Sequence, residues 1–179
     1  AIISASIVCI FQDNLKRMLA YSSVAQVGYF VIGISLASSA GLAATLLHIF
    51  NHALMKGALF MCLGCIAWQY KTVNLNDLRG LGLKIPWTMG VFFIGSLSLI
   101  GVPLTAGFIS KWYMIIAALD KGWWPIILVI IIGSLLAVTY IWRVIEALYF
   151  RTEPNVKAYR EAPLSMLLPA WLLALANIY

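Results

Sequence analysis

The chain has 179 residues, of which 63% are hydrophobic and 10% are charged, and its mean hydropathy is +0.97. A typical soluble domain is about 45–50% apolar and about 25% charged, so this composition excludes a water-soluble globular fold. The formal net charge is +6, but the cations form no run or stripe, which excludes a nucleic-acid-binding surface. We therefore expect an all-α protein embedded in the lipid bilayer.

Charged and polar residues divide the chain into apolar segments that are candidates for helices across the bilayer. Each crossing needs about 20 mainly apolar residues. In chain order, the segments are 1–12, 18–37, 41–68, 85–119, 123–150 and 164–179. The chain begins and ends within apolar sequence and has neither an initiator Met nor a basic leader. We expect a fragment of a longer protein with about six membrane segments, the first and last of them partial.

The segment 85–119 is too long for one straight crossing. As a single helix it would extend about 52 Å at about 1.5 Å per residue, whereas the hydrocarbon core is about 30 Å thick. Gly101, Pro103 and Gly107 combine a missing backbone donor with flexible positions, so we expect the helix to break there. Such a break is tolerated only inside protein or beside a wet cavity, which points to function. The alternative is a tilted helix with a proline kink.

The basic residues of the loops predict how the chain is oriented. If every segment crosses, three loops lie on one side and hold eight cations, while the opposite loops hold only Lys121. The eight are Lys16, Arg17, Lys71, Arg79, Lys84, Arg151, Lys157 and Arg160. Because basic loops are retained in the cytoplasm, we assign the side with eight cations to the cytoplasm.

Ionisable residues inside the apolar segments mark the candidate functional site, because a charge at the bilayer centre costs at least about 2.5–3.5 kcal/mol. His48, His52 and Lys56 are spaced four residues apart, which places them on one helical face over about 12 Å. Imidazole exchanges protons near neutral pH and a desolvated lysine can also do so, so this row is suited to a proton relay. The alternative is that each His only hydrogen-bonds a neighbouring helix.

Lys111 follows the expected helix break, about 12 Å of helix before Leu119, and is expected near the middle of the membrane if Leu119 marks the interface. We expect it to bind freed backbone carbonyls there and to change its protonation, or else to extend towards the outer headgroups. Arg143 and Glu146 are three residues apart near the cytoplasmic end of their segment and are expected to form a structural ion pair. Both are accessory candidates for the proton path.

The sequence predicts no catalytic, cofactor or metal site in this chain. It contains no phosphate-binding loop, catalytic triad pattern, ligand cluster or nucleotide fingerprint. The three cysteines, Cys9, Cys62 and Cys65, lie in apolar stretches and are expected to be packing residues.

Three stretches carry a family resemblance: 14–29 (NLKRMLAYSSVAQVGY), 48–60 (HIFNHALMKGALF) and 101–112 (GVPLTAGFISKW). In this order they resemble the antiporter-like membrane subunits shared by respiratory NADH:quinone oxidoreductase, membrane-bound hydrogenases and Mrp-type sodium/proton antiporters. Within that family, 142–150 and 161–166 are most similar to the D-type component of the Mrp antiporter complex.

The resemblance implies a fold of fourteen membrane helices with two inverted repeats, each with a broken helix and a proton half-channel. This chain would match the end of the ninth helix through most of the fourteenth. The resemblance places His48, His52 and Lys56 on the proton path of the eleventh helix, and Lys111 at the end of the path beside the broken twelfth. The half-channel that admits protons from the cytoplasm would lie outside this chain.

The first of these stretches supplies two further accessory candidates, Gln26 and Tyr29. Some family members have His at the position of Gln26, which makes a relay step there specific to those members. Tyr29 is the last residue of this stretch.

We therefore expect proton translocation by a subunit of an Mrp-type sodium/proton antiporter in the bacterial inner (plasma) membrane. Its partners would be other membrane subunits, the lipid bilayer, protons and sodium. The first alternative is a proton-pumping subunit of NADH:quinone oxidoreductase or membrane-bound hydrogenase. The second is a non-conducting structural or assembly subunit, in which the buried ionisable groups would be paired and dry.

Overall fold

The computed structural model describes residues 1–150 and 160–178, and these ranges contain helices and connecting turns but no strand. The helices are α1 (Ile2–Ile10), α2 (Leu15–Ser35), α3 (Ser39–Tyr70), the 3₁₀ helix η1 (Leu75–Leu78), α4 (Pro86–Ile100), α5 (Ala106–Asp120), α6 (Trp124–Tyr149) and α7 (Leu164–Leu175). By length and composition, α2, α3 and α6 can each cross a membrane, and α4 and α7 are shorter apolar helices. The predicted helical membrane fold is confirmed.

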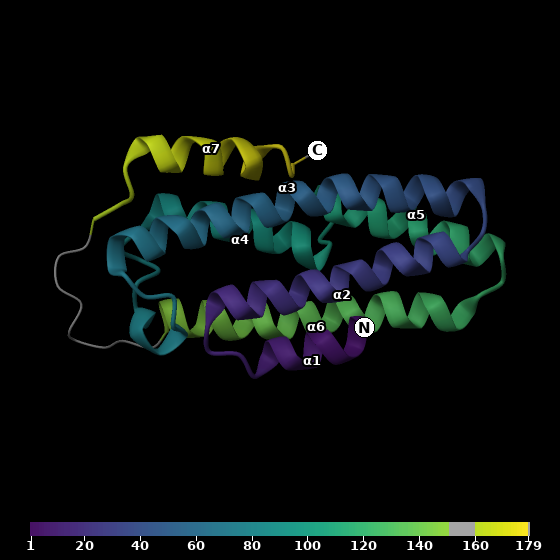
Figure 1. Cartoon of the computed structure of the whole chain (residues 1–179), viewed down its shortest axis with the longest axis horizontal. Helices are drawn as coiled ribbons and strands as arrows, with labels where there is room; N and C mark the ends of the chain where they lie inside the picture. The colour runs from purple at the N-terminus through teal and green to yellow at the C-terminus, as the bar shows by residue number, and fades with distance from the viewer. Residues whose placement is uncertain (151–159, 179) are drawn as a thin grey trace.

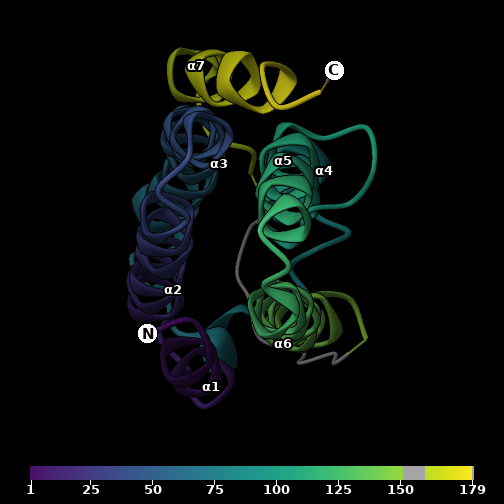
Figure 2. The ribbon, with the colours of Figure 1, turned by 90° about the vertical axis from the view of Figure 1, so that its right-hand side faces the viewer.

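The helices lie along one another in two rows. Figure 1 shows them running along the long axis of the molecule, and Figure 2 shows α1, α2 and α3 in one row and α4, α5 and α6 in the other. The last helix, α7, packs on α3 and α4 at the edge of this arrangement. The largest apolar cluster joins the two rows through side chains such as Leu59, Phe92 and Ile141. The cysteines are buried and free, as the sequence predicts.

The predicted break separates α4 from α5. Gly101 ends α4 with a φ of +89°, a backbone conformation that favours glycine, and Pro103 lies in the turn that follows. Thr105 then caps α5 by accepting a hydrogen bond from the backbone N–H of Phe108. At Gly107 a Cβ atom would lie 1.8 Å from the backbone oxygen of Ser98, so only glycine allows the two half-helices to approach this closely. The discontinuous helix near Gly101–Gly107 is therefore confirmed.

Residues at the C-terminal end of the described chain form backbone contacts with the start of α5, directly after the break. The backbone N–H of Ala106 donates to the backbone oxygen of Asn177 at 3.0 Å. Thr105 and Ile178 form an isolated antiparallel bridge next to it. The first turn of α5 is thus fixed by residues that follow α7, about 70 positions further along the chain.

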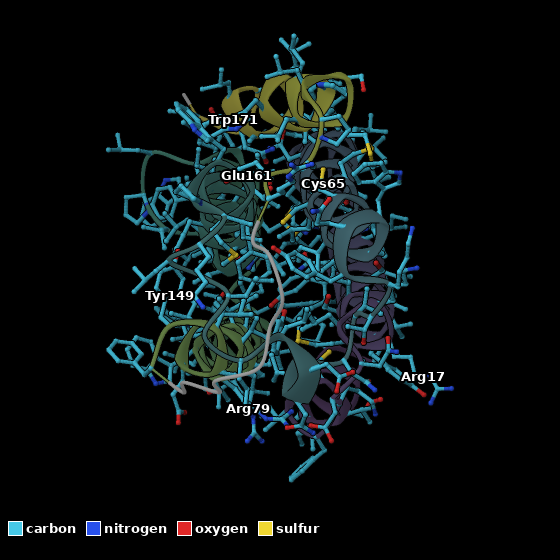
Figure 3. All side chains as sticks on the ribbon, turned by 90° about the vertical axis from the view of Figure 1, so that its left-hand side faces the viewer. Arg17, Cys65, Arg79, Tyr149, Glu161 and Trp171 are labelled. Atoms are coloured by element: carbon cyan, nitrogen blue, oxygen red, sulfur yellow. The ribbon has the colours of Figure 1, made fainter. Side chains whose placement is uncertain are left out.

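The turns between α1 and α2 and between α3 and α4 lie at one end of the molecule (Figure 1). Figure 3 faces this end, where Arg17 and Arg79 project at the rim. The turn that holds Lys121 lies at the opposite end. Arg151 and Lys157, two of the eight predicted cytoplasmic cations, lie outside the described residues. Which end faces the cytoplasm stays a prediction.

Glu161 ties the segment before α7 to the start of α4. The backbone N–H of Trp87 donates to Glu161 Oε1 at 2.8 Å, and the hydroxyl of Thr88 donates to Oε2 at 2.7 Å. A carboxylate stabilises a helix N-terminus because the free N–H groups there carry partial positive charge. Figure 3 labels Glu161 on the face with the basic loops.

Arg143 joins α6 to the end of α1. Its guanidinium donates to the backbone oxygens of Ile10 at 2.6 Å and Gln12 at 2.9 Å, and it forms an ion pair with Asp13. The sequence predicted Glu146 as the partner of Arg143, and the structure adds a partner from a separate segment. A predicted accessory residue of the proton path thus caps a helix at the end of the molecule.

We expect Arg143→Ala to lower the stability of the full-length subunit, because the acceptors at the end of α1 lose their donor. The expected loss is about 1–3 kcal/mol. It would be measured as a lower midpoint of thermal unfolding in detergent. Thr139→Ala, which removes an exposed hydroxyl one turn earlier in α6, is the matched control and should leave the midpoint unchanged. Equal midpoints for the two variants would contradict the capping role.

Candidate functional site

Lys111 belongs to α5, and its side-chain nitrogen reaches the helix break, where groups of α4 and α6 bind it. Its ammonium donates to the backbone oxygens of Leu99 at 3.0 Å and Ile100 at 2.9 Å, and to the hydroxyl oxygen of Ser134 at 3.1 Å. The residue is 4% exposed. Its nitrogen is therefore bound within the protein rather than extended towards headgroups.

The break supplies two of these acceptors. Leu99 and Ile100 belong to the last turn of α4, where carbonyls have no helical donor. Pro103 occupies the position that would donate to Leu99 in a continuous helix and has no N–H to give. The C-terminal end of α4 also carries partial negative charge, which stabilises the ammonium. Breaking the helix thus creates the binding site for the lysine.

Tyr29 and a groove complete the surroundings of Lys111. The lysine nitrogen lies 5.1 Å from the centre of the Tyr29 ring, within range of a cation–π interaction. A groove of about 220 Å³ opens beside it between α5 and α6, lined by apolar side chains such as Trp112 and Ile130 and by Ser134. The carbonyls of α4 and the hydroxyl of Ser134 are therefore the polar partners of Lys111, and the groove beside them is otherwise lined mainly by apolar side chains.

Lys56 is the second buried lysine and is 5% exposed. From α3 it donates to the backbone oxygen of Leu19 at 2.8 Å and to the hydroxyl oxygen of Ser22, both on α2. Ser22 is itself fully buried and donates to the same Leu19 oxygen at 2.9 Å. As at Lys111, the acceptors are one helix backbone and one serine.

His48 joins three helices. Its Nε2 lies 2.8 Å from Gln26 Oε1 on α2, and its Nδ1 lies 2.7 Å from Ser110 Oγ on α5. Because the amide oxygen can only accept, the neutral ring carries its proton on Nε2 and accepts from the Ser110 hydroxyl on Nδ1. Ser110 directly precedes Lys111 in the chain. His48 therefore links the accessory candidate Gln26 to the immediate vicinity of Lys111.

His52 has a different environment. Its ring meets the ring of Phe30 edge to face, with centres 5.6 Å apart, and Phe30 also contacts His48 at 5.5 Å. The buried Nδ1 of His52 has no hydrogen-bond partner among the described residues. The three ionisable residues share one helix face, but the hydrogen bonds of the described chain join only His48 and Lys56 to α2.

The sequence did not single out the hydroxyl groups that bind these residues. They are Ser22, Ser110 and Ser134. One signal for Ser22 was present, because it lies four residues before Gln26 and seven before Tyr29, on the same face of α2. Ser134 had no such signal, since its partner is 23 positions away on another helix.

Comparison with known proteins gives a consistent set of relatives. A family model described as NADH:quinone oxidoreductase/Mrp antiporter, TM, matches residues 1–137. The chain is 41% identical to NADH-quinone oxidoreductase subunit N of Desulforudis audaxviator, over 99% of this chain and 38% of that protein. It is 33% identical to subunit N of Geotalea uraniireducens, over 89% of this chain and 34% of that protein. The chain thus spans little more than a third of these relatives' length.

Two solved structures share the fold. The Mrp complex from Dietzia sp. superposes with a TM-score of 0.90 at 23% identity, over 98% of this chain and 41% of the matched chain. The membrane-bound sulfane sulfur reductase, an archaeal respiratory membrane complex, gives a TM-score of 0.91 at 31% identity, over 98% and 29%. The sequence predicted that the chain is most similar to the D-type component of an Mrp antiporter. The two curated relatives described above are instead both named subunit N of NADH-quinone oxidoreductase.

Proposed function

This chain belongs to the NADH:quinone oxidoreductase/Mrp antiporter transmembrane family, and from that membership we propose that it conducts protons within a multisubunit membrane complex. We further propose that residues 1–179 form the C-terminal part of a longer conducting domain. The observation that carries the proposal is the pair of buried lysines, Lys56 and Lys111, whose hydrogen bonds go to backbone carbonyls and serine hydroxyls.

Neutral partners suit a lysine that exchanges its proton. A buried lysine bound to a carboxylate is held in its charged form by the opposite charge, and removing either charge is costly. The acceptors around Lys56 and Lys111 carry dipoles rather than full charges, and hydroxyls can either accept or donate. Both lysines can therefore keep hydrogen bonds to serine in the protonated and in the neutral form.

The proposed route runs from Lys56 through His52 and His48 to Lys111 and leaves on the side of Lys121. His48 contacts Ser110, the residue before Lys111, so the last step crosses from α3 to α5. His52 lies between Lys56 and His48 on the same helix face and is proposed as the protonation site between them, because the hydrogen bonds of the described residues do not join Lys56 to His48. Gln26 orients His48 through its amide oxygen.

We propose that a redox reaction elsewhere in the complex drives this proton movement. The relatives with 41% and 33% identity are named as subunits of NADH-quinone oxidoreductase, and the second solved structure belongs to a respiratory complex. The second candidate is sodium/proton exchange in an Mrp-type complex. This candidate is favoured by the sequence resemblance of 142–150 and 161–166 to the D-type component of the Mrp antiporter. The fold shared with an Mrp complex also favours it. In either case the partners are other membrane subunits, and we propose the plasma membrane as the location, with the basic loops in the cytoplasm.

Inverted membrane vesicles that carry the full-length subunit in its native complex test the driver. Vesicles with the wild-type subunit are compared with vesicles that lack it, using a pH-sensitive dye. Acidification on addition of NADH that depends on the subunit is the expected result. A proton flux that appears only on addition of sodium would replace the redox assignment with the antiporter. If the proton flux were equal with and without the subunit, both on addition of NADH and on addition of sodium, the subunit would have the non-conducting structural role.

A further inference from the structure

A fully buried asparagine lies beside the histidines of α3. Asn51 follows His48 by about one helical turn and directly precedes His52, and the residue is 0% exposed. Its side-chain nitrogen, Nδ2, donates to the backbone oxygen of Ala106 at 2.7 Å. Ala106 is the first residue of α5, where the chain becomes helical again after the break. Asn51 therefore joins α3 to the start of the second half-helix.

Ala106 is also bound through its N–H, by the segment that follows α7. This N–H donates to the backbone oxygen of Asn177 at 3.0 Å. Asn177 is itself fully buried, and its side-chain nitrogen donates to the backbone oxygen of Leu173, in the last turn of α7, at 2.7 Å. Both polar backbone groups of Ala106 are thus bound by asparagines from other parts of the chain. The start of α5 is therefore fixed relative to α3 and to the end of α7.

The hydrogen bond from Asn51 lies next to the contact between His48 and Ser110. Ser110 follows Ala106 by about one turn of α5, just as His48 precedes Asn51 by about one turn of α3. His48 Nδ1 lies 2.7 Å from Ser110 Oγ. The two side-chain hydrogen bonds thus join the same two helices about one turn apart, and Lys111 directly follows the second. A shift of α5 away from α3 would lengthen both of them.

Asn51 also restricts where the hydroxyl of Ser110 can donate its proton. Three acceptors lie within reach of this oxygen: His48 Nδ1 at 2.7 Å, the Gly107 backbone oxygen at 3.2 Å and the Ala106 backbone oxygen at 3.4 Å. A carbonyl oxygen has two lone pairs. At Ala106 the helix uses one of them for the backbone N–H of Ser110, and Asn51 uses the other. One of the two backbone oxygens that compete with His48 for the hydroxyl proton is therefore occupied.

Stability alone does not account for an asparagine at this position. Its amide oxygen, Oδ1, is buried and has no hydrogen-bond partner among the described residues. Leaving a buried acceptor unpaired costs at least as much free energy as one intramolecular hydrogen bond contributes. Asn51 therefore adds little net stability to the packing of α3 against α5. What its bond to Ala106 supplies is a fixed position for the start of α5.

We infer that Asn51 is a positioning residue for proton transfer between His48 and Ser110, next to Lys111. The inference rests on the proposed function. Asn51 takes up and releases no proton itself, because its amide nitrogen acts only as a hydrogen-bond donor. It holds the start of α5 where His48 and Ser110 meet, and it occupies an oxygen that competes for the Ser110 hydroxyl.

The test compares Asn51→Ala with the wild type in the full-length subunit within its complex. Thr45→Val is the matched control, because Thr45 is buried on the same helix and its hydroxyl donates to the Gly41 backbone oxygen within α3. The initial rate of acidification in inverted vesicles is measured in ordinary and in heavy water, at equal content of assembled complex. The midpoint of thermal unfolding in detergent is measured for the same preparations.

We expect Asn51→Ala to slow proton translocation about ten-fold, because a small displacement of a proton donor from its acceptor slows the transfer between them. That transfer then limits the overall rate, so the ratio of the rates in ordinary and heavy water should rise above the wild-type ratio. The unfolding midpoint should stay at the wild-type value. Thr45→Val should match the wild type in all three measurements.

A wild-type rate of translocation by Asn51→Ala would overturn the inference. A slower rate with an unchanged isotope ratio would also overturn it, because that is the result of a purely structural defect. If Lys111→Met also translocated at the wild-type rate, the proposed function itself would fail. Loss of translocation in Lys111→Met, together with a wild-type rate in Asn51→Ala, would confine the failure to the positioning role.

Discussion

Lys111→Met is expected to reduce proton translocation about a hundredfold or more while leaving the complex assembled. Methionine fills nearly the same volume but offers no proton, and a positioned proton-transfer group contributes about 10²–10⁴ in rate. The freed carbonyls of Leu99 and Ile100 would lose their donor, so some loss of stability is expected as well. The initial rate of acidification in inverted vesicles, divided by the amount of assembled complex, separates the two effects.

Two further variants make this result specific. Lys111→Arg keeps the charge and the donors but does not release its proton, so it should assemble and remain inactive. Lys121→Met, in the exposed turn after α5, removes a lysine from the C-terminal end of the same helix and should translocate at the wild-type rate. Wild-type translocation by Lys111→Met would contradict the proposed role, and so would full activity of Lys111→Arg.

Gly107→Ala is expected to have the largest effect on the fold. Its added Cβ would lie 1.8 Å from the Ser98 backbone oxygen. Side-chain rotation cannot relieve this clash, because the positions of both atoms are fixed by the backbone. The two half-helices would have to separate, at a cost of roughly 3 kcal/mol or more. We expect little assembled complex and a lower unfolding midpoint of what remains.

Gly64→Ala provides the matched control for this prediction. A Cβ at Gly64, within α3, meets nothing within 4 Å, and alanine is the better helix former. We expect unchanged or slightly higher stability. If both glycine variants assembled equally well, the close approach at the break would not be required for the fold.

The sequence predicted the helices and the break because both depend on local features. Apolar segments between charged loops are sufficient to place helices, and Pro103 between two glycines is sufficient to interrupt one. The environment of Lys111 could also be anticipated, since its carbonyl partners arise from the break a few residues earlier. These features are all set by residues close together in the chain.

Features that depend on how helices face one another were not predictable in the same way. Spacing placed His48, His52 and Lys56 on one face of α3, but could not show that Phe30 contacts both histidines. The contacts of Arg143 with Asp13 and of Tyr29 with α6 join residues more than 100 positions apart. Polar residues without charge, such as Ser134, give no signal in an apolar helix until its neighbour is known.

Proton uptake driven by NADH, in vesicles whose complexes carry Lys56→Met or Lys111→Met in the full-length subunit, tests the central claim most directly. The claim is that protons pass through both buried lysines. At equal complex content, we predict that each variant loses nearly all of the uptake that depends on the subunit, while Lys121→Met retains it. Wild-type uptake by both Lys56→Met and Lys111→Met would contradict the account.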